Sequence, residues 1–246
     1  MAIDLTGKTV LVTGANRGIG KSIAEAFLAA GVAKVYASAR SPESVQPLID
    51  EHGDKVVALA LDLVAPASIT AAAEAASDVD VVVNNGGVLK PGSPLDPVVL
   101  DNIDFEFDVN VKGLVRLAQA FAPILKANGG GTLVQLNSIA SIKNFAAFTS
   151  YAASKAAAYS LTQGLREALA EQNTEVVSVH PGPIQTDMGD SAGFEGAPPP
   201  SVVADALVEG VRHGTFHVFP DEMAKDFWNA YQSYAAAIVD PVAAEA

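Results

Sequence analysis

Tyr151 and Lys155 are the residues of this sequence whose types and spacing most directly indicate chemistry. They lie four positions apart in Tyr151-Ala-Ala-Ser-Lys155, a stretch of small, helix-compatible residues. On a helix, positions i and i+4 lie on one face, so the phenol and the ammonium would be neighbours. Because a nearby positive charge favours the phenolate, we expect the pKa of Tyr151 to lie below its usual value of about 10. The pair predicts a proton-transfer site, although the same spacing alone also occurs on surface helices without chemistry.

The elements that must position this pair follow from hydrophobic patterning. Short apolar runs rich in valine alternate with longer segments of alanine, leucine and spaced charges. Most of the runs are too continuous for half-exposed strands and indicate central strands of a parallel sheet covered on both faces. We expect strands over 9–13, 34–38, 56–61, 79–83, 132–136, 175–179 and 216–219, and helices over 19–30, 67–76, 99–126, 151–171 and 201–211. This alternation predicts a doubly wound α/β fold.

The composition shows no break or repeat along the chain, which predicts a single domain over residues 1–246. Two segments are expected to be irregular, 90–97 and 187–200. The second is rich in glycine, ends in Pro198-Pro199-Pro200 and follows a strand end. That position suits a mobile substrate flap, and a solvent-exposed loop would have the same composition.

The composition also excludes several classes of function. Half of the residues are hydrophobic and the formal net charge is −13, so neither nucleic acid nor an anionic membrane is an expected partner. There is no cysteine, which rules out disulfides, thiolate metal sites and cysteine nucleophiles. The first residues lack a signal-peptide pattern and no apolar run approaches the roughly 20 residues of a membrane span, so a cytoplasmic location is expected.

A glycine-rich turn, Thr13-Gly14-Ala15-Asn16-Arg17-Gly18-Ile19-Gly20, joins the first expected strand to the first helix. Glycines let backbone N–H groups approach a pyrophosphate at a helix N-terminus. The spacing is Gly-x-x-x-Gly-x-Gly rather than the Gly-x-Gly-x-x-Gly of many dinucleotide folds. Such a turn alone can be purely structural, but its place in the first β-α-β unit favours nucleotide binding.

Arg40 stands at the end of the second strand, where an acidic residue would bind the ribose 2′-hydroxyl of NAD(H). A planar guanidinium instead suits a 2′-phosphate, and Arg17 would add a second cation. We therefore expect NADP(H) as the cofactor; the alternative is that Arg40 is a solvated loop residue. Asp62, after the third strand, is expected either to accept from the adenine amino group or to cap the helix that begins near Pro66.

Taken together, these segments resemble the short-chain dehydrogenase/reductase family over nearly the whole chain. The motifs that carry the resemblance are Thr13-Gly14-x-x-x-Gly18-x-Gly20, Asn84-Asn85-Gly86-Gly87, Asn110, Ser138, Tyr151-x-x-x-Lys155 and Pro181-Gly182. Their order and spacing are far more specific than any single motif. One departure is Gly86, where the family more often has alanine; both residues are small, and we expect at most a looser turn.

The resemblance implies a Rossmann-type fold with a seven-stranded parallel sheet, and hydride transfer between a nicotinamide and a carbonyl/alcohol pair. It implies a catalytic tetrad of Asn110, Ser138, Tyr151 and Lys155. Tyr151 would be the proton donor, and Ser138 would orient the carbonyl oxygen. Lys155 would lower the phenol pKa and bind the nicotinamide ribose, and Asn110 would hold a water that resupplies protons. Read alone, Ser138 could merely cap a turn and Asn110 could satisfy backbone groups at a helix kink.

The expected cofactor contacts come from the glycine turn, the strand ends and the turn after the sixth strand. They are Gly14, Asn16, Arg17, Gly18, Ile19, Gly20, Arg40, Asp62, Leu63, Asn85, Gly86, Tyr151, Lys155, Pro181, Gly182, Ile184 and Thr186, with Thr186 at the nicotinamide carboxamide. No carboxylate cluster accompanies the four histidines, so no catalytic metal is expected, and His180 is assigned a packing role.

Two features bear on assembly and on the substrate. The aromatic tail over 227–234 is expected to be a docked helix, a subunit contact or a wall of the substrate pocket. The segments 99–126 and 151–171 correspond to helices that commonly form the dimer interface of the family, so a homodimer or homotetramer is expected. An apolar pocket is indicated by Ala140, Ile142, Phe145, Ala146 and Phe148.

The expected function is NADP(H)-dependent reduction of a ketone or aldehyde to an alcohol. The first alternative is an alcohol dehydrogenase that works mainly in oxidation, because one site serves both directions. An enoyl reductase is disfavoured because such relatives typically space their tyrosine and lysine more widely. A non-enzymatic alternative is a catalytically idle NADP(H)-binding sensor. The intact Ser138, Tyr151 and Lys155 argue against it.

Overall fold

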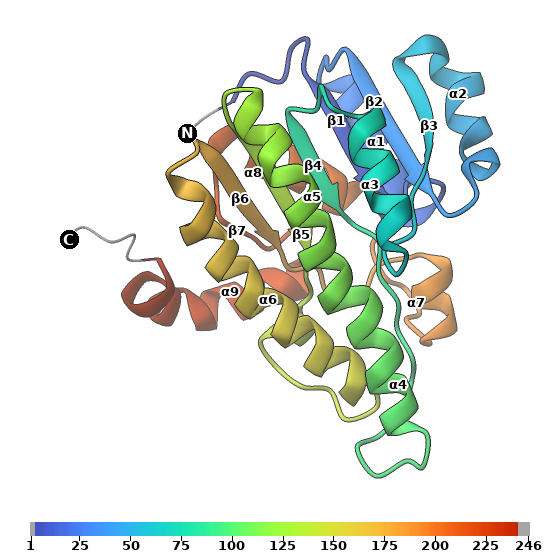
Figure 1. The fold of residues 1–246 in the computed structure, drawn as a ribbon. Helices are drawn as coiled ribbons and strands as arrows, with labels where there is room; N and C mark the ends of the chain where they lie inside the picture. Colours follow the sequence, from blue (N-terminus) through green and yellow to red (C-terminus); the bar gives the residue numbers. More distant parts are fainter. Residues whose placement is uncertain (1–2, 241–246) are drawn as a thin grey trace.

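Valine-rich runs form the seven strands of one parallel sheet, in the order β3-β2-β1-β4-β5-β6-β7 (Figure 1). The computed structural model describes residues 3–240. The strands are β1 (Thr9–Thr13), β2 (Lys34–Ala39), β3 (Val56–Ala60), β4 (Val81–Asn84), β5 (Gly131–Leu136), β6 (Thr174–Val179) and β7 (His217–Val218). The strand order reverses between β1 and β4, the position at which doubly wound folds bind ligands.

Helices cover both faces of the sheet, because successive side chains of a buried strand point to opposite sides. Val10 and Val12 of β1 belong to one core with α1, α2 and α8, whereas Leu11 belongs to a second core with α3, α5 and α6. The helices are α1 (Gly18–Ala29), α2 (Gln46–His52), α3 (Pro66–Ala75), α4 (Val99–Glu106), α5 (Gly113–Ala127), α6 (Thr149–Ala170), α7 (Asp187–Ser191), α8 (Ser201–His213) and α9 (Glu222–Tyr234). The expected doubly wound α/β fold with seven parallel strands is confirmed.

The helical segment expected over 99–126 is wrong in one respect, because it is not one regular helix. A π-helical turn, Phe107–Lys112, separates α4 from α5. Asn110 is buried in this turn and bonds both backbone groups of Val88. Both flanking segments are helical in composition, so the sequence pattern did not separate them. Such turns are frequent at functional sites.

Three smaller expectations also differ from the structure. The irregular segment 187–200 opens with the short helix α7, whose N-terminus is capped by Thr186: its hydroxyl accepts the Gly189 N–H at 3.0 Å. Helix α2 was not expected, because its few apolar residues form no clear helical period. Strand β4 spans Val81–Asn84 rather than 79–83, since its pairing to β1 starts at Val81.

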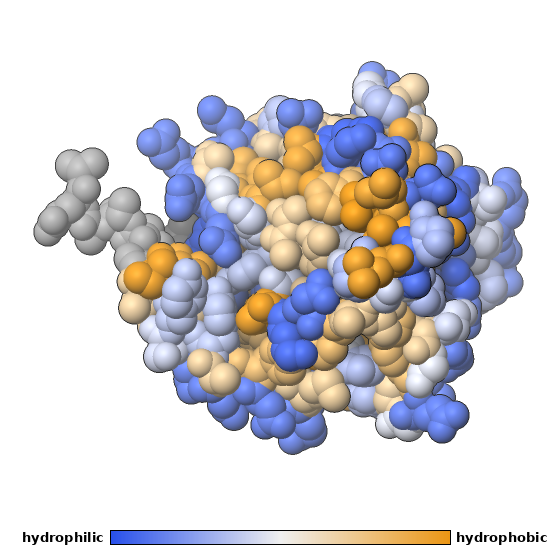
Figure 2. Space-filling model, turned by 90° about the horizontal axis from the view of Figure 1, so that it is seen from below, coloured by the Kyte–Doolittle hydropathy of each residue, from blue (hydrophilic) through white to orange (hydrophobic). Residues whose placement is uncertain are grey.

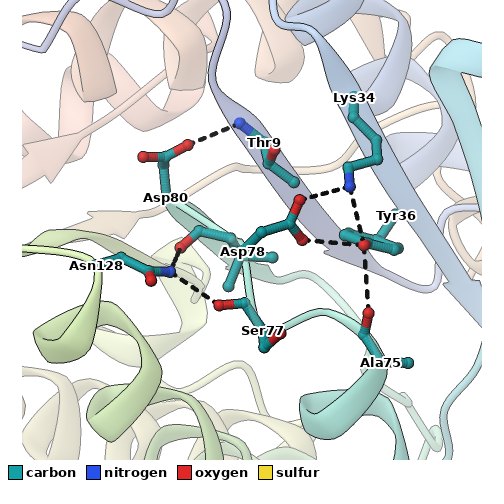
Figure 3. Close-up of polar contacts among 9 residues, drawn as sticks. Thr9, Lys34, Tyr36, Ala75, Ser77, Asp78, Asp80 and Asn128 are labelled. Carbon is teal, nitrogen blue, oxygen red and sulfur yellow. Dashed lines mark hydrogen bonds and ion pairs between the residues drawn. The ribbon is translucent and has the colours of Figure 1, made fainter.

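A polar network fixes the amino ends of the central strands, at the edge opposite the catalytic residues described below (Figure 3). Asp78 accepts hydrogen bonds from Lys34 at 2.5 Å and from the Tyr36 hydroxyl at 2.9 Å. Asp80 accepts the Thr9 N–H at 2.8 Å. The connection from α3 to β4 is thereby tied to β1 and β2, which holds the strand register that places the glycine turn. No helix within residues 3–240 is long and apolar enough to cross a bilayer.

Candidate active site

The four expected catalytic side chains come together near the carboxyl ends of β4 and β5. Asn110 comes from the π-helical turn, Ser138 from the end of β5, and Tyr151 and Lys155 from the first turns of α6. Ser138 follows β5 and lies within hydrogen-bonding reach of the Tyr151 hydroxyl. A Cβ placed on Gly87, after β4, would lie 3.2 Å from Asn110 Oδ1 and 3.6 Å from Lys155 Nζ, so both side chains border the same glycine. The sequence therefore identified a real spatial cluster from segments up to 45 positions apart.

Tyr151 and Lys155 lie on one face of α6, with Lys155 Nζ 5.7 Å from the centre of the Tyr151 ring. The expectation of a lowered phenol pKa is wrong for this structure. Burial raises the pKa of Tyr151 to about 12, which outweighs the lowering by the Ser138 hydrogen bond. Burial also lowers the pKa of Lys155 to about 8, and its amine donates to the Leu136 carbonyl at 2.7 Å. The amine is thus tied to the end of β5 rather than to the phenol.

Ser138 caps a turn, as one of its two alternatives predicted, and also lies beside Tyr151. Its hydroxyl accepts the Ala140 N–H at 3.1 Å and caps a 3-10 turn, Ile139–Ser141. The same hydroxyl faces Tyr151, so the cap fixes its direction toward the phenol. Its location at the end of a buried strand makes this orientation rigid.

His180 supports the backbone of Ser138 from the neighbouring strand β6. Its Nδ1 lies 3.2 Å from the Ser138 carbonyl oxygen and its Nε2 lies 2.7 Å from Ser178 Oγ. Burial lowers the pKa of His180 to about 3, so the ring is neutral. A carbonyl can only accept, so Nδ1 carries the proton and Nε2 accepts from Ser178. The packing role assigned to His180 thus includes fixing the strand end that carries Ser138.

Asn110 satisfies backbone groups, as one of its two alternatives predicted. Its Oδ1 accepts the Val88 N–H and its Nδ2 donates to the Val88 carbonyl, both at 2.9 Å. Nδ2 also donates to Ser154 Oγ at 2.9 Å, and Ser154 in turn donates to the Tyr151 carbonyl. Asn110 therefore ties the end of β4 to the helix that carries Tyr151.

The glycine turn has the geometry that a dinucleotide requires. Gly14 and Gly18 have φ values of +65° and +53°, and a Cβ on Gly20 would lie 2.1 Å from the Gly14 carbonyl oxygen. Helix α1 begins at Gly18, and Arg17 at its N-cap makes no side-chain capping bond. The N–H groups of this first turn are left for a bound anion, so these residues fit a pyrophosphate.

The segment after β4 braces this turn. Asn85 Nδ2 donates to the Thr13 carbonyl at 2.8 Å, and Thr13 Oγ1 accepts the N–H groups of Asn85 and Gly86. A Cβ on Gly86 would lie 2.9 Å from Leu63 Cδ1. The departure at Gly86 therefore does not loosen the turn, because the buried Leu63 side chain occupies the space that alanine would need.

The charged residues expected at the adenosine end have different surroundings. Arg40 is exposed just beyond β2. Arg17 is also exposed, and its guanidinium forms an ion pair with Asp187 at the start of α7. Asp62 does not cap α3: its Oδ1 accepts the Val64 N–H at 3.1 Å, and the N-cap is Ala65. Asp62 therefore shapes the loop after β3, where an adenine would lie in a fold of this kind.

The turn after β6 reaches across to the glycine turn. The Thr186 methyl carbon Cγ2 would lie 3.2 Å from a Cβ on Gly18, so this segment packs on the start of α1. Pro181 and Ile184 are buried. The Gly182 N–H donates to Asp221 Oδ2 at 2.7 Å, and Asp221 also caps α9. Asp221 was missed by the sequence analysis, although an acid directly before a helix was a usable capping signal.

An apolar hollow adjoins the catalytic strand ends. A cavity of about 380 Å³ is lined by Ile142, Asp226, Phe227, Ala230 and Tyr231, so the tail helix α9 meets the segment after Ser138. Figure 2 shows hydrophobic side chains gathered around a hollow on the face seen from below the sheet. Phe148 also contacts Phe194, with ring centroids 5.7 Å apart, which joins the predicted pocket segment to the segment 187–200.

A glycine turn at the point where the strand order reverses, beside a Ser-Tyr-Lys cluster, defines a nicotinamide-dependent oxidoreductase. The family model described as short chain dehydrogenase matches residues 8–194, and the chain belongs to this family. Oxidoreductase UcpA of Escherichia coli (strain K12) is 35% identical over 211 residues, which cover 82% of this chain and 79% of that protein. The 7alpha-hydroxysteroid dehydrogenase of the same strain is 35% identical over 194 residues, covering 75% and 74%.

A solved structure extends the similarity over almost the entire chain. A short chain dehydrogenase from Burkholderia cenocepacia J2315 in complex with NADP has a TM-score of 0.85 at 31% identity, covering 97% of this chain and 100% of that one. A 7 alpha-hydroxysteroid dehydrogenase complexed with NADH and 7-oxo glycochenodeoxycholic acid has a TM-score of 0.77 at 30% identity, covering 84% and 88%. Structures similar to this chain thus hold nicotinamide cofactors with and without the 2′-phosphate.

Proposed function

We propose that this chain is an NADP(H)-dependent oxidoreductase that reduces a ketone or aldehyde to an alcohol, with Tyr151 as the proton donor. The observation that carries the proposal is the hydrogen-bonding proximity of Ser138 and Tyr151 at the end of β5, with Lys155 beside them on α6. Two hydroxyls on rigid elements can hold one carbonyl oxygen between them. The same sheet edge carries the glycine turn, so one domain supplies both halves of the reaction.

NADPH, when bound, supplies the hydride. The Tyr151 hydroxyl donates its proton to the oxygen on which negative charge develops, and its raised pKa keeps that proton in place at neutral pH. Ser138 donates a hydrogen bond to the same oxygen and orients it. The Lys155 ammonium stabilises the phenolate left after transfer. Asn110 holds the end of β4 beside the amine, and its Oδ1 keeps a second acceptor site for a water.

The substrate that we propose is an apolar carbonyl compound. The lining of the cavity supports this, since Ile142, Phe227, Ala230 and Tyr231 provide mostly apolar surface. A ketone-bearing steroid ligand is bound by one similar structure, which is consistent with an apolar pocket in this family. We further propose a cytoplasmic homodimer or homotetramer, supported by exposed Phe105 and Leu161 on α4 and α6.

NADPH oxidation with a panel of aliphatic, aromatic and polycyclic ketones tests the proposed function. We expect turnover with apolar ketones and the reverse reaction with the corresponding alcohols and NADP⁺. Oxidation of alcohols without detectable ketone reduction would favour the alcohol dehydrogenase alternative. Tight NADPH binding with no turnover in either direction would instead favour an idle sensor and contradict the proposal.

The cofactor preference is expected to depend on Arg40. Replacing Arg40 with aspartate removes a charge-assisted contact to the 2′-phosphate and adds repulsion, so the KM for NADPH should rise about 10²-fold while the KM for NADH changes little. Arg212→Asp, which makes the same charge change on α8, serves as the matched control. Steady-state kinetics with both cofactors measures the effect; an unchanged NADPH preference in Arg40→Asp would remove Arg40 from the cofactor site.

A further inference from the structure

Glu106 is a buried acid beside the active site that the proposed chemistry leaves without a role. It is the last residue of α4, immediately before the π-helical turn that holds Asn110, and it is 0% exposed. Carboxylates are almost never fully buried unless they are paired. Its Oε1 accepts the Lys90 N–H at 2.7 Å, whereas its Oε2 has no hydrogen-bond partner among the described residues. A full negative charge at this place requires a compensating cation.

The buried positive group on the active-site side of Glu106 is the Lys155 amine. Helix α4 packs against α6, which carries Lys155 and Tyr151, and the two helices lie side by side in Figure 1. Lys155 is itself only 5% exposed, and its amine has one neutral acceptor, the Leu136 carbonyl. The Lys155 ammonium lowers the pKa of Glu106, and the Glu106 carboxylate raises the pKa of Lys155. Two buried groups of opposite sign therefore act on each other across the interface between α4 and α6.

The other groups that face Glu106 complete its surroundings. From the loop after β4, the Lys90 side chain adds a second positive charge, but Lys90 is exposed and its amine lies over the Phe105 ring at 5.6 Å. From α6, the Ser150 hydroxyl is fully buried and also faces the carboxyl, and the Tyr151 phenol feels its charge. Burial raises the pKa of Glu106, against the lowering effects of Ser150 and the two lysines. The exposed Lys90 amine lowers the pKa of Glu106 more than the Lys155 amine does. In the other direction, the charge that raises the pKa of the buried Lys155 amine is that of Glu106.

We propose that Glu106 is a positioning residue of the active site: its buried carboxylate is the counter-ion that keeps the Lys155 side chain in its ammonium form. This inference rests on the proposed function for its catalytic meaning only. Without that carboxylate, burial alone would favour the neutral amine, which cannot stabilise the Tyr151 phenolate. Glu106 touches neither substrate nor cofactor in this scheme and acts through Lys155.

The first experiment measures the charge of Lys155 directly in the protein without cofactor or substrate. Competitive acylation of the lysines, followed by mass spectrometry, gives the pH at which the Lys155 amine is half reactive. We expect a value near 8 in the wild type and a fall of about one pH unit in Glu106→Gln, since one opposite charge is removed. Glu106→Asp should restore part of the difference. Asp104→Asn removes an exposed charge from the same helix and should leave the value unchanged.

The second experiment is the pH profile of turnover. The basic limb of kcat, where Lys155 loses its proton, should move to lower pH in Glu106→Gln by the same amount, and a purely structural role would not move it. An unchanged half-reactive pH of Lys155 in a folded Glu106→Gln protein overturns the proposal. If the chain turns out not to reduce carbonyl compounds, the acylation result still decides whether Glu106 and Lys155 are coupled, so the two failures are distinguishable.

A third measurement applies if Glu106→Gln is too unstable for kinetics. Removing one of two buried, oppositely charged groups leaves the other charge uncompensated, which costs more than removing both. Two effects of Lys155→Met on the urea midpoint of unfolding are therefore compared. The decrease should be larger when the change is made in the wild type than when it is made in Glu106→Gln. Additive losses in this cycle would show that the two groups do not interact and would overturn the proposal.

Discussion

Replacing Tyr151 with phenylalanine is expected to lower kcat for carbonyl reduction by at least about 10²-fold, the usual scale of general acid catalysis. The change removes only the hydroxyl that lies within hydrogen-bonding reach of Ser138. The ring, half-buried on α6, keeps its packing, and the glycine turn is untouched. The affinity for NADPH, measured by fluorescence titration, should therefore stay within about threefold of the wild type, and the loss should appear in kcat.

Tyr159→Phe provides the matched control for this prediction. Tyr159 lies two turns further along α6, and its hydroxyl bonds His217 rather than any catalytic group. Removal of that hydroxyl is expected to reduce stability and to leave kcat close to the wild-type value. Near-full turnover of Tyr151→Phe with intact NADPH binding would show that Tyr151 is not the proton donor.

The parts of the fold that could be predicted are those in which local sequence and tertiary environment agree. The strands β1 and β5 were predicted at or within one residue of their ends because a strand covered on both faces is apolar at nearly every position. Helix α6 was predicted because alanine, leucine and spaced charges run through it without a break. The π-helical turn around Asn110 was missed, and the buried Asn110 in it bonds Val88, 22 positions earlier, a contact that local periodicity does not report.

The site shows the same division between residue types and environments. The four catalytic candidates were found from order and spacing, but the pKa of Tyr151 was predicted in the wrong direction. The spacing placed a lysine beside the Tyr151 phenol. The pKa of that phenol is set mainly by burial, and burial depends on elements distant in the chain. Glu106 and the contact of Leu63 with Gly86 were missed for that reason. A single sequence carries few signals for which charged side chain will be fully enclosed.

A large loss of stability in mild acid is expected from two buried histidines, His180 and His217. Their side chains are 0% and 8% exposed, and burial lowers the pKa of His180 to about 3 and that of His217 to about 4, from an ordinary value of 6.5. The histidines of the unfolded chain take up protons near pH 6.5, whereas those of the folded chain do not. Their contribution to the free energy of unfolding is therefore complete above pH 6.5 and decreases as the pH falls toward the pKa values of the folded state. Between pH 6.5 and 5 the loss should be about 2 kcal/mol for each histidine.

The physical basis is that neither ring can accept a charge without breaking neutral contacts. His180 stacks on Phe219 with ring centroids 4.8 Å apart, and the centroids of the two histidine rings lie 6.0 Å apart, so a charge on one opposes a charge on the other. His217 Nε2 lies 2.6 Å from the Tyr159 hydroxyl and its Nδ1 lies 3.6 Å from Asp240. Asp240 favours the charged ring, but burial outweighs it. Protonation therefore disfavours the packing of the strand ends behind Ser138.

Urea unfolding at several pH values between 5 and 7.5 measures this prediction. His180→Gln and His217→Gln should each be less stable than the wild type at pH 7.5. Between pH 6.5 and 5, however, the stability of each variant should decrease only about half as much as that of the wild type, because one titrating ring is gone. His213→Gln removes an exposed histidine from the end of α8 and should leave the decline unchanged. Carboxylates titrate mainly below this range and are common to all variants, so the difference in slope isolates the histidines. Wild-type stability that is flat from pH 7.5 to 5 would mean that the two rings remain accessible to protons in the folded protein, and would contradict the assignment of His180 as a neutral donor to Ser138.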